Sequence, residues 1–197
     1  MTADRGLRLW FLALYAIDIV GFLTTVARVR RERPVFERQI GPLPEVGALV
    51  AWLVPPVILL SGIGRLEMEV PIVRALGVAL SLYALIVVAW TVRTLGRQLI
   101  PGLAVLPDHV LVTSGPYRWL RHPMYSGALA LWLGAALGTL NWLLLALWPV
   151  LVAGIVRELP KEEGMLRDKF GSSYAVYEAQ AGRLIPRVWG RRGPSAG

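Results

Sequence analysis

The sequence predicts an all-α polytopic membrane protein, a bundle of about five transmembrane helices. Its 197 residues are 55% hydrophobic and 17% charged, whereas soluble domains carry about 25% charged residues. Four runs with at most one charge reach at least 18 residues, close to the roughly 20 that a spanning helix needs. The basic residues are concentrated in alternate segments between these runs. No cysteine is present, which excludes disulfides, thiolate metal sites and a cysteine nucleophile.

The first three runs are each predicted to form one transmembrane helix. The first contains a single charge, Asp18, and arginines rather than a small-residue cleavage site follow it, which favours an uncleaved span over a signal peptide. Two interpretations of Asp18 stay open: an intramembrane functional residue, or a bundle-facing acid that is paired or protonated. Pro55 and Pro56 are expected to kink the second helix. The three runs are residues 9–27, 46–63 and 75–92.

The fourth run is predicted to fold into a helix hairpin. It contains 33 uncharged residues, 124–156, and a single helix of that length would measure about 50 Å against a bilayer core of about 30 Å. Gly-Thr-Leu-Asn at 138–141 has turn chemistry. We therefore expect antiparallel helices over 124–138 and 141–157, with Pro160 breaking the second helix from the tail. This C-terminal hairpin completes the five membrane segments.

The positions of arginine and lysine predict the orientation of the helices. With five spans, three segments fall on one side of the membrane, and they hold 17 of the 21 basic residues. Because basic segments stay in the cytoplasm, we expect an integral protein of the cell membrane with its N-terminus outside and its C-terminus cytoplasmic. The asymmetry accounts for the net charge of +8 without nucleic acid, and it favours contact with membrane lipids. The basic segments are residues 28–38, 93–121 and 157–192.

Two common ligand motifs are not found in this sequence. His109 and His122 are 13 residues apart with no third ligand type nearby, so we expect no metal site. The Gly-x-Gly at 62–64 follows an apolar helix instead of a strand, so it is not a dinucleotide fingerprint. Any site chemistry is therefore expected from the polar stretches that flank the helix hairpin.

GPYRWLRHPMYSG, residues 115–127, is the first of these polar stretches. It leads into the fourth apolar run, and the free amides at the N-terminus of that helix can bind a carboxylate or a phosphate. Arg118 and Arg121 are additional partners for an anion, and Tyr117 and Tyr125 offer aromatic faces to a base or a cation. The alternative is that the arginines reach lipid headgroups and the tyrosines form an interfacial belt.

The tail after the hairpin is the second polar stretch. An acidic pair, Glu162-Glu163, stands in an otherwise basic segment and is well placed to bind an amine, a sulfonium or ribose hydroxyls. A stripe of apolar residues follows with helical spacing, and it is expected to pack on the bundle or to lie on the membrane. The stripe consists of Leu166, Phe170, Tyr174 and Tyr177.

Together, these stretches resemble the isoprenylcysteine carboxyl methyltransferase family and its bacterial and archaeal relatives, which also resemble phospholipid methyltransferases. The resemblance covers about residues 95–187. It rests on LVTSGPYRWLRHPMYSG at 111–127, on the hairpin at 124–157 and on EEGMLRDKFGSSYAVYEAQAGRLIP at 162–186. The last stretch fits the family's order of a glutamate pair, leucine, Phe-Gly, two tyrosines, arginine and proline.

The resemblance implies S-adenosylmethionine as the methyl donor, held in a cytoplasmic cofactor-binding cap formed by the connector and the tail. It also implies a lipophilic acceptor, a small molecule or a prenylated substrate, with a carboxylate as the group that is methylated. The transmembrane helices of residues 1–92 would precede a methyltransferase core of residues 93–197. The implied catalytic residues are Arg157 and Glu162. The implied cofactor-binding residues are His109, Val110, Leu111, Val112, Tyr117, His122, Pro123, Met124, Tyr125 and Glu162.

The sequence departs from the family where a substrate-contacting arginine is expected, a few residues before the glutamate pair. Arg157 is nearby, but Glu158 and Pro160 alter the spacing, and Glu158 is the other candidate for that position. Two further functions stay open. One is methylation of a phospholipid amine. The other is NADPH-dependent reduction, because membrane sterol and enone reductases also resemble the Arg-His-Pro-x-Tyr stretch, although the tail motif favours the methyltransferase.

Overall fold

The computed structural model describes residues 2–32, 43–99 and 109–187, and in these ranges the chain is helical, as predicted. Two short 3₁₀ turns, Gly96–Gln98 and Gly115–Arg118, flank the connector between the third and fourth helices. The predicted frayed end at 190–197 lies outside the described residues. The helices are α1 (Thr2–Glu32), α2 (Leu43–Ser61), α3 (Pro71–Leu95), α4 (Pro123–Gly138), α5 (Trp142–Phe170) and α6 (Ser172–Gln180).

The five predicted membrane segments correspond to α1 through α5. Within the described residues, three helices are long and apolar enough to cross a membrane: Asp4–Thr25 of α1, the whole of α3, and α5. Trp52–Ser61 of α2 is a shorter apolar helical stretch. α4 has 16 residues, which corresponds to about 24 Å of helix and is less than a full bilayer core.

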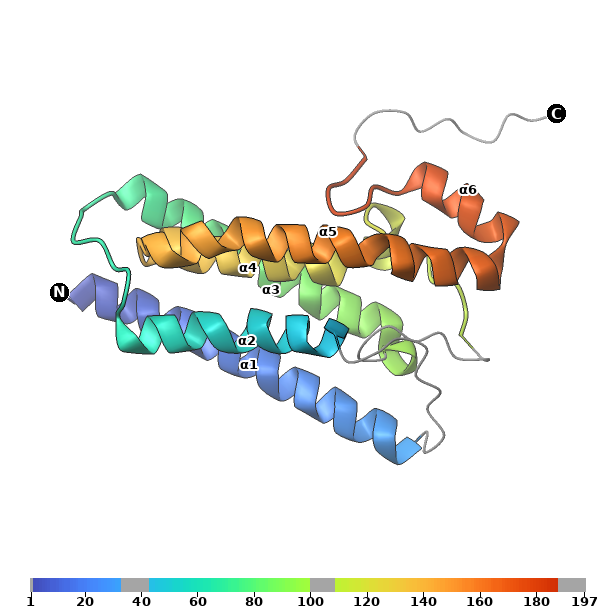
Figure 1. Cartoon of the computed structure of the whole chain (residues 1–197), viewed down its shortest axis with the longest axis horizontal. Helices are drawn as coiled ribbons and strands as arrows, with labels where there is room; N and C mark the ends of the chain where they lie inside the picture. Colours follow the sequence, from blue (N-terminus) through green and yellow to red (C-terminus); the bar gives the residue numbers. More distant parts are fainter. Residues whose placement is uncertain (1, 33–42, 100–108, 188–197) are drawn as a thin grey trace.

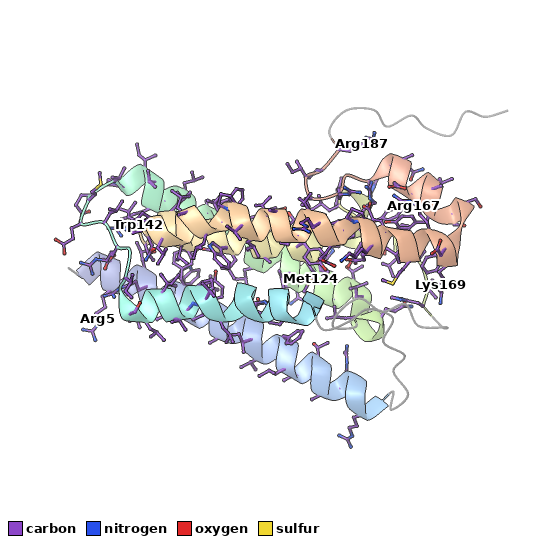
Figure 2. All side chains as sticks on the ribbon, in the orientation of Figure 1. Arg5, Met124, Trp142, Arg167, Lys169 and Arg187 are labelled. Carbon is purple, nitrogen blue, oxygen red and sulfur yellow. The ribbon has the colours of Figure 1, made fainter. Side chains whose placement is uncertain are left out.

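The two ends of the bundle differ in chemistry. Figure 1 shows the N-terminus, the α2–α3 loop and the α4–α5 turn at one end, with residues 109–122 of the connector and α6 at the other. The labelled residues in Figure 2 follow this division: Arg5 and Trp142 lie at the first end, and Arg167, Lys169 and Arg187 at the second. The basic connector and tail therefore share one end, as the charge pattern predicts, while the direction across the membrane stays a prediction.

The predicted turn between α4 and α5 is confirmed, and Asn141 organises it. The Asn141 side chain accepts a hydrogen bond from the Leu144 amide at 3.0 Å, which caps α5, and donates to the Ile63 carbonyl at 2.8 Å. Leu140 adopts a positive φ of 50° at the tip. Side-chain capping of this kind satisfies amides that helix geometry leaves unpaired. The turn therefore fixes the hairpin and anchors it to the α2–α3 loop.

Small residues bring α3 and α4 into close contact, and this positions the hairpin. A Cβ atom added at Gly77 would lie 2.6 Å from the Gly134 carbonyl oxygen and would also meet the Gly138 backbone. Such glycines let two helix backbones approach closely, as in many membrane helix pairs. The core beside this crossing contains Phe11, Leu59, Trp132, Ala135 and Leu144.

The prediction that Pro160 breaks the helix is wrong, because α5 continues through Pro149 and Pro160 to Phe170. A helical proline removes one hydrogen bond and costs about 3 kcal/mol. Leu159 and Glu163, on either side of Pro160, are fully buried, and their contacts offset that cost. The helix ends at Gly171, whose positive φ of 53° favours glycine. The glutamate pair therefore lies on the same helix as the fifth membrane segment.

Candidate functional site

The stretch before α4 pairs with the chain that follows α6. Leu120 and Gly182 form a parallel β-bridge, in which the Arg121 amide donates to the Gly182 carbonyl at 2.7 Å. The Gly182 amide donates to the Trp119 carbonyl at 2.9 Å. A side chain at Gly182 would collide with the Ile185 carbonyl oxygen, so this approach requires glycine. The backbone pairing joins the connector to the tail, which the sequence predicts as the two halves of one site.

Three side chains from the connector and the tail surround Glu163 of α5. The four residues are here called the Glu163 cluster: Glu163, Arg121, His122 and Arg183. The Glu163 side chain is fully buried. Its Oε1 accepts hydrogen bonds from Nε of Arg121 and Nε of Arg183, each at 3.0 Å, and Arg183 Nη2 donates to Oε2. Burying an unpaired carboxylate costs several kcal/mol, so these cations are what allow Glu163 to lie inside the protein.

The His122 ring lies between the two neighbouring glutamates. Its Nε2 is 3.2 Å from Oε1 of Glu163, and its Nδ1 is 3.6 Å from Oε1 of Glu162. Burial disfavours the charged ring, but hydrogen bonds and charge attraction from both glutamates outweigh it and raise the pKa of His122. A protonated ring donates from both nitrogens, which suits a position between two acceptors. His122 therefore links the Glu163 cluster to Glu162.

Glu162 differs from Glu163 in exposure and in partners. Its side chain is 29% exposed, yet its Oε2 is buried and has no hydrogen-bond partner among the described residues. The Tyr125 ring lies 5.9 Å from the His122 ring between centroids, and Glu162 is close enough for its charge to act on the Tyr125 hydroxyl. Burial, together with the nearby charge of Glu162, raises the pKa of Tyr117 and keeps its phenol neutral. An unpaired carboxylate oxygen beside two aromatic rings fits a ligand that brings ammonium or hydroxyl donors.

The N-terminus of α4 borders this carboxylate, as the sequence predicts. Pro123 occupies the first helical turn, and the N-cap residue, His122, makes no side-chain capping hydrogen bond. Helix geometry leaves the amides of Met124 and Tyr125 without intrahelical acceptors. Amides at a helix N-terminus favour an anionic ligand group. Hydrogen-bond donors, the amides of Met124 and Tyr125, therefore lie next to a hydrogen-bond acceptor, the Glu162 carboxylate.

The predicted cofactor residues of the connector lie beside α6. The Val110 amide donates to Oε1 of Gln98 at 3.0 Å, which holds the segment against the end of α3. Leu111 and Tyr117 pack on the apolar stripe of the tail, and the Tyr177 hydroxyl donates to the Tyr117 carbonyl at 2.9 Å. His109 and Val112 are half-buried at either end of this segment. The stripe therefore packs on the bundle, which was one of its two predicted positions.

Arg157 and Glu158 take different positions on α5. Arg157 is exposed, whereas Glu158 lies one helical turn before Glu162 on the same face. Glu158 is close enough for its charge to act on the Tyr125 hydroxyl. It also accepts a hydrogen bond from Lys161 at 2.9 Å. Of the two candidates for the substrate-contacting position, Glu158 is therefore the one that the structure brings towards Tyr125 and Glu162.

Sequence reasoning missed the separate position of Glu163 and its partnership with Arg183. The acidic pair was interpreted as one ligand-binding unit, but adjacent residues on a helix point about 100° apart. The available signal was this angle, together with two arginines, Arg121 and Arg183, in the motifs on either side of the hairpin. Without knowledge of the pairing between connector and tail, neither arginine could be assigned to Glu163.

Sequence comparison with known proteins shows that this chain is similar to methyltransferases. The family model described as phospholipid methyltransferase matches residues 72–173, from α3 to the start of α6. A protein-S-isoprenylcysteine O-methyltransferase of Tribolium castaneum is 37% identical over 84 residues, which are 42% of this chain and 30% of the relative. A probable protein-S-isoprenylcysteine O-methyltransferase of Oryza sativa subsp. indica is 35% identical over 82 residues, which are 41% of this chain and 43% of the relative. The matched part thus spans less than half the length of either relative.

A solved structure shares the fold. It is the eukaryotic intramembrane Ras methyltransferase ICMT (isoprenylcysteine carboxyl methyltransferase), which superposes with a TM-score of 0.56 over 91% of this chain and 67% of that chain. The sequence identity is 21%, so the likeness concerns the fold alone. Because this fold belongs to an intramembrane protein and three described helices are long enough to cross a bilayer, the chain is a membrane protein.

Proposed function

This chain belongs to the phospholipid methyltransferase family, and we propose that it transfers a methyl group from S-adenosylmethionine to a lipophilic acceptor at the cytoplasmic face of the membrane. The observation that carries the proposal is the buried Oε2 of Glu162, which has no hydrogen-bond partner among the described residues. It lies beside His122 and Tyr125 at the end of the hairpin. The donor has an ammonium and ribose hydroxyls, which are the groups that such an oxygen accepts.

The residues around Glu162 fit the other groups of S-adenosylmethionine. When bound, the donor supplies an electrophilic methyl group on a sulfonium. The uncapped amides of Met124 and Tyr125 would hold its carboxylate. The rings of Tyr117 and Tyr125 would face its cationic sulfonium and its adenine. The segment 109–112 would close the pocket from the connector, and Pro123 with His122 would fix the start of α4.

The role of this chain in the transfer is mainly positioning. A substrate carboxylate is already ionised at neutral pH, so it attacks a methyl group without a strong base. What the protein must do is align the two reactants and keep water away from them. The buried Glu163 cluster supports this by holding the connector, α5 and the tail together. In this proposal Arg157 recognises the acceptor carboxylate, which is the role that the resemblance to isoprenylcysteine carboxyl methyltransferases implies for it.

An amine acceptor is the second candidate, and Glu158 favours it. Two carboxylates one turn apart, Glu158 and Glu162, act on the same Tyr125 hydroxyl. They would repel a carboxylate substrate but attract an alkylammonium. Such an amine must lose its proton before its lone pair attacks the methyl carbon, and Glu158 is placed to accept that proton. If the acceptor is an amine, Glu158→Gln abolishes transfer while Arg157→Ala leaves it intact; a carboxylate acceptor gives the opposite result.

The proposal also assigns a role to each part of the chain and a side of the membrane to each terminus. Residues 93–197 would form the methyltransferase core, with the transmembrane helices of residues 1–92 as its membrane support. The family match begins at residue 72, so α3 lies within the matched region as well. The N-terminus would lie outside the cell and the tail in the cytoplasm. Cysteine accessibility labelling at Thr2 and at Ser173 in intact cells tests this orientation.

A binding experiment tests the donor site directly. Purified protein in detergent is titrated with S-adenosylmethionine, with its demethylated product and with NADPH. We expect the first two to bind, and Glu162→Gln to weaken both by roughly tenfold to a hundredfold, since it removes one charge-assisted hydrogen bond. Asp168→Asn, an exposed acid on the same helix, is the control and keeps full affinity. Binding of NADPH alone would overturn the proposal.

A further inference from the structure

An open groove of about 510 Å³ lies beside α6 at the basic end of the bundle. None of its lining residues belongs to the predicted cofactor-binding or catalytic set. It is formed by Glu178 of α6, by the chain after α6 and by one connector residue, so it exists only because the tail pairs with the connector. Figure 2 labels Arg187 at this end of the molecule. The lining residues are Arg121, Glu178, Ala181, Gly182, Arg183, Ile185, Pro186 and Arg187.

Three arginines face this groove, and they exceed the acidic groups that balance them. Glu178 is the acidic residue of the lining, and it is bound by Arg167, whose Nη2 donates to Oε1 at 2.6 Å. This contact lowers the pKa of Glu178. Glu163 lies behind the groove and binds Arg121 and Arg183. The three groove arginines and Arg167 thus face two carboxylates, Glu163 and Glu178, which leaves positive charge in excess. Among the described residues, Arg187 contacts neither carboxylate. The groove therefore attracts an anion.

Arg187 carries this excess charge at the open side of the groove. Its Nη1 donates to the Ala179 carbonyl at 2.7 Å, a neutral acceptor that fixes the guanidinium without cancelling its charge. The side chain is exposed. Arg121 is the opposite case, because its side chain is 10% exposed and its Nη1 donates to the carbonyls of Glu178 and Ala181. One buried and one exposed arginine thus give the groove a rigid base and an accessible rim.

Apolar side chains next to the groove indicate what kind of anion it binds. Ile185 and Pro186 are lining residues and both are exposed, Ile185 to 77%. A soluble anion gains nothing from such neighbours, whereas a lipid brings acyl chains with its headgroup. We propose that this groove binds the phosphate of an anionic phospholipid, with the apolar residues contacting the lipid body.

The test compares one groove variant with a matched control in detergent-purified full-length protein. Dissociation constants are measured for short-chain phosphatidylglycerol, short-chain phosphatidylcholine and inorganic phosphate. Arg187→Ala removes the exposed groove cation, and Arg93→Ala removes an exposed arginine of α3 outside the groove. We expect phosphatidylglycerol to bind the native chain most tightly. Its affinity falls about fivefold in Arg187→Ala, as for one basic residue near an anionic lipid, and stays unchanged in Arg93→Ala.

Three results would count against this site. Equal weakening by the two variants would show diffuse attraction between charges instead of a groove. Equal affinity for phosphatidylcholine would show that the anionic headgroup is not recognised. Inorganic phosphate binding as tightly as phosphatidylglycerol would make a soluble phosphate the ligand and remove the lipid from the proposal. Lipid-free melting temperatures of both variants, expected to match the native chain, show that each variant folds.

Discussion

Replacing Glu163 by glutamine should undock the tail, whereas replacing Glu162 should not. Glu163 is fully buried and binds Arg121, Arg183 and His122 at 3.0 to 3.2 Å. Glutamine has nearly the same shape but no charge, so Glu163→Gln leaves these cations facing a neutral amide. Glu162 is 29% exposed and one of its oxygens lacks a partner, so Glu162→Gln removes little that the folded protein uses.

The magnitude follows from burial. Removing one partner of a buried ion pair costs about 3–5 kcal/mol. Glutamine retains one oxygen as an acceptor for Arg121 or Arg183, so we expect the lower value, about 3 kcal/mol, which is roughly a hundredfold in the equilibrium for opening the tail. Partly exposed ion pairs contribute about 1 kcal/mol or less, which sets the limit for Glu162→Gln.

Hydrogen exchange measures this difference locally. The backbone pairing gives two reporter amides, those of Arg121 and Gly182, which donate to partners across the connector and the tail at 2.7 and 2.9 Å. Both amides should exchange roughly a hundred times faster in Glu163→Gln and at the native rate in Glu162→Gln. Amides within α4 serve as an internal reference. Equal protection of the reporter amides in both variants would refute the assignment of Glu163 as the structural member of the pair.

The remaining predictions concern His122 and the α3–α4 crossing. The pKa of His122 is raised in the folded protein, so its proton stabilises the fold. This contribution is complete below the ordinary histidine pKa of about 6.5 and is lost as the pH rises through the raised value. The melting-temperature difference between the native chain and His122→Gln should therefore shrink from pH 6 to pH 9; a difference that grows would contradict the charged ring. Gly77→Ala places a methyl group against the backbone of α4 and should destabilise the bundle by about 1–3 kcal/mol. Gly154→Ala, which meets no atom within 4 Å, should leave the melting temperature unchanged or slightly higher.

Helix positions could be predicted from the sequence because the dominant signal, apolar length, is local. The hairpin turn was predictable from the excess length of one uncharged run and the chemistry of residues 138–141, and Asn141 occupies the capping position there. The end of α5 was not predictable in this way. Whether Pro160 breaks a helix depends on the burial of Leu159 and Glu163 on either side, and burial is a property of the tertiary structure.

The candidate site shows the same limit. The hairpin implies that the stretch at 115–127 and the glutamate pair meet at one end of the bundle, and the contacts of His122 with both glutamates confirm this. The structural role of Glu163 and the ligand-binding role proposed for Glu162 could not be told apart from the sequence. The distinction depends on the backbone pairing of residues 119–122 with 182–183, which brings Arg183 beside Glu163 and has no signature in local sequence.

The continuity of α5 has a consequence for how the proposed site is assembled. A break at Pro160 would allow the glutamate pair to turn independently of the membrane segment. Because α5 is unbroken from Trp142 to Phe170, the rotation of the membrane helix also sets the directions of Glu158 and Glu162. The α4–α5 turn fixes that rotation through Asn141, at the far end of the same helix (Figure 1). The positions of the acidic side chains are therefore determined by packing within the bundle, and the tail adds Arg183, which holds Glu163 together with Arg121 of the connector.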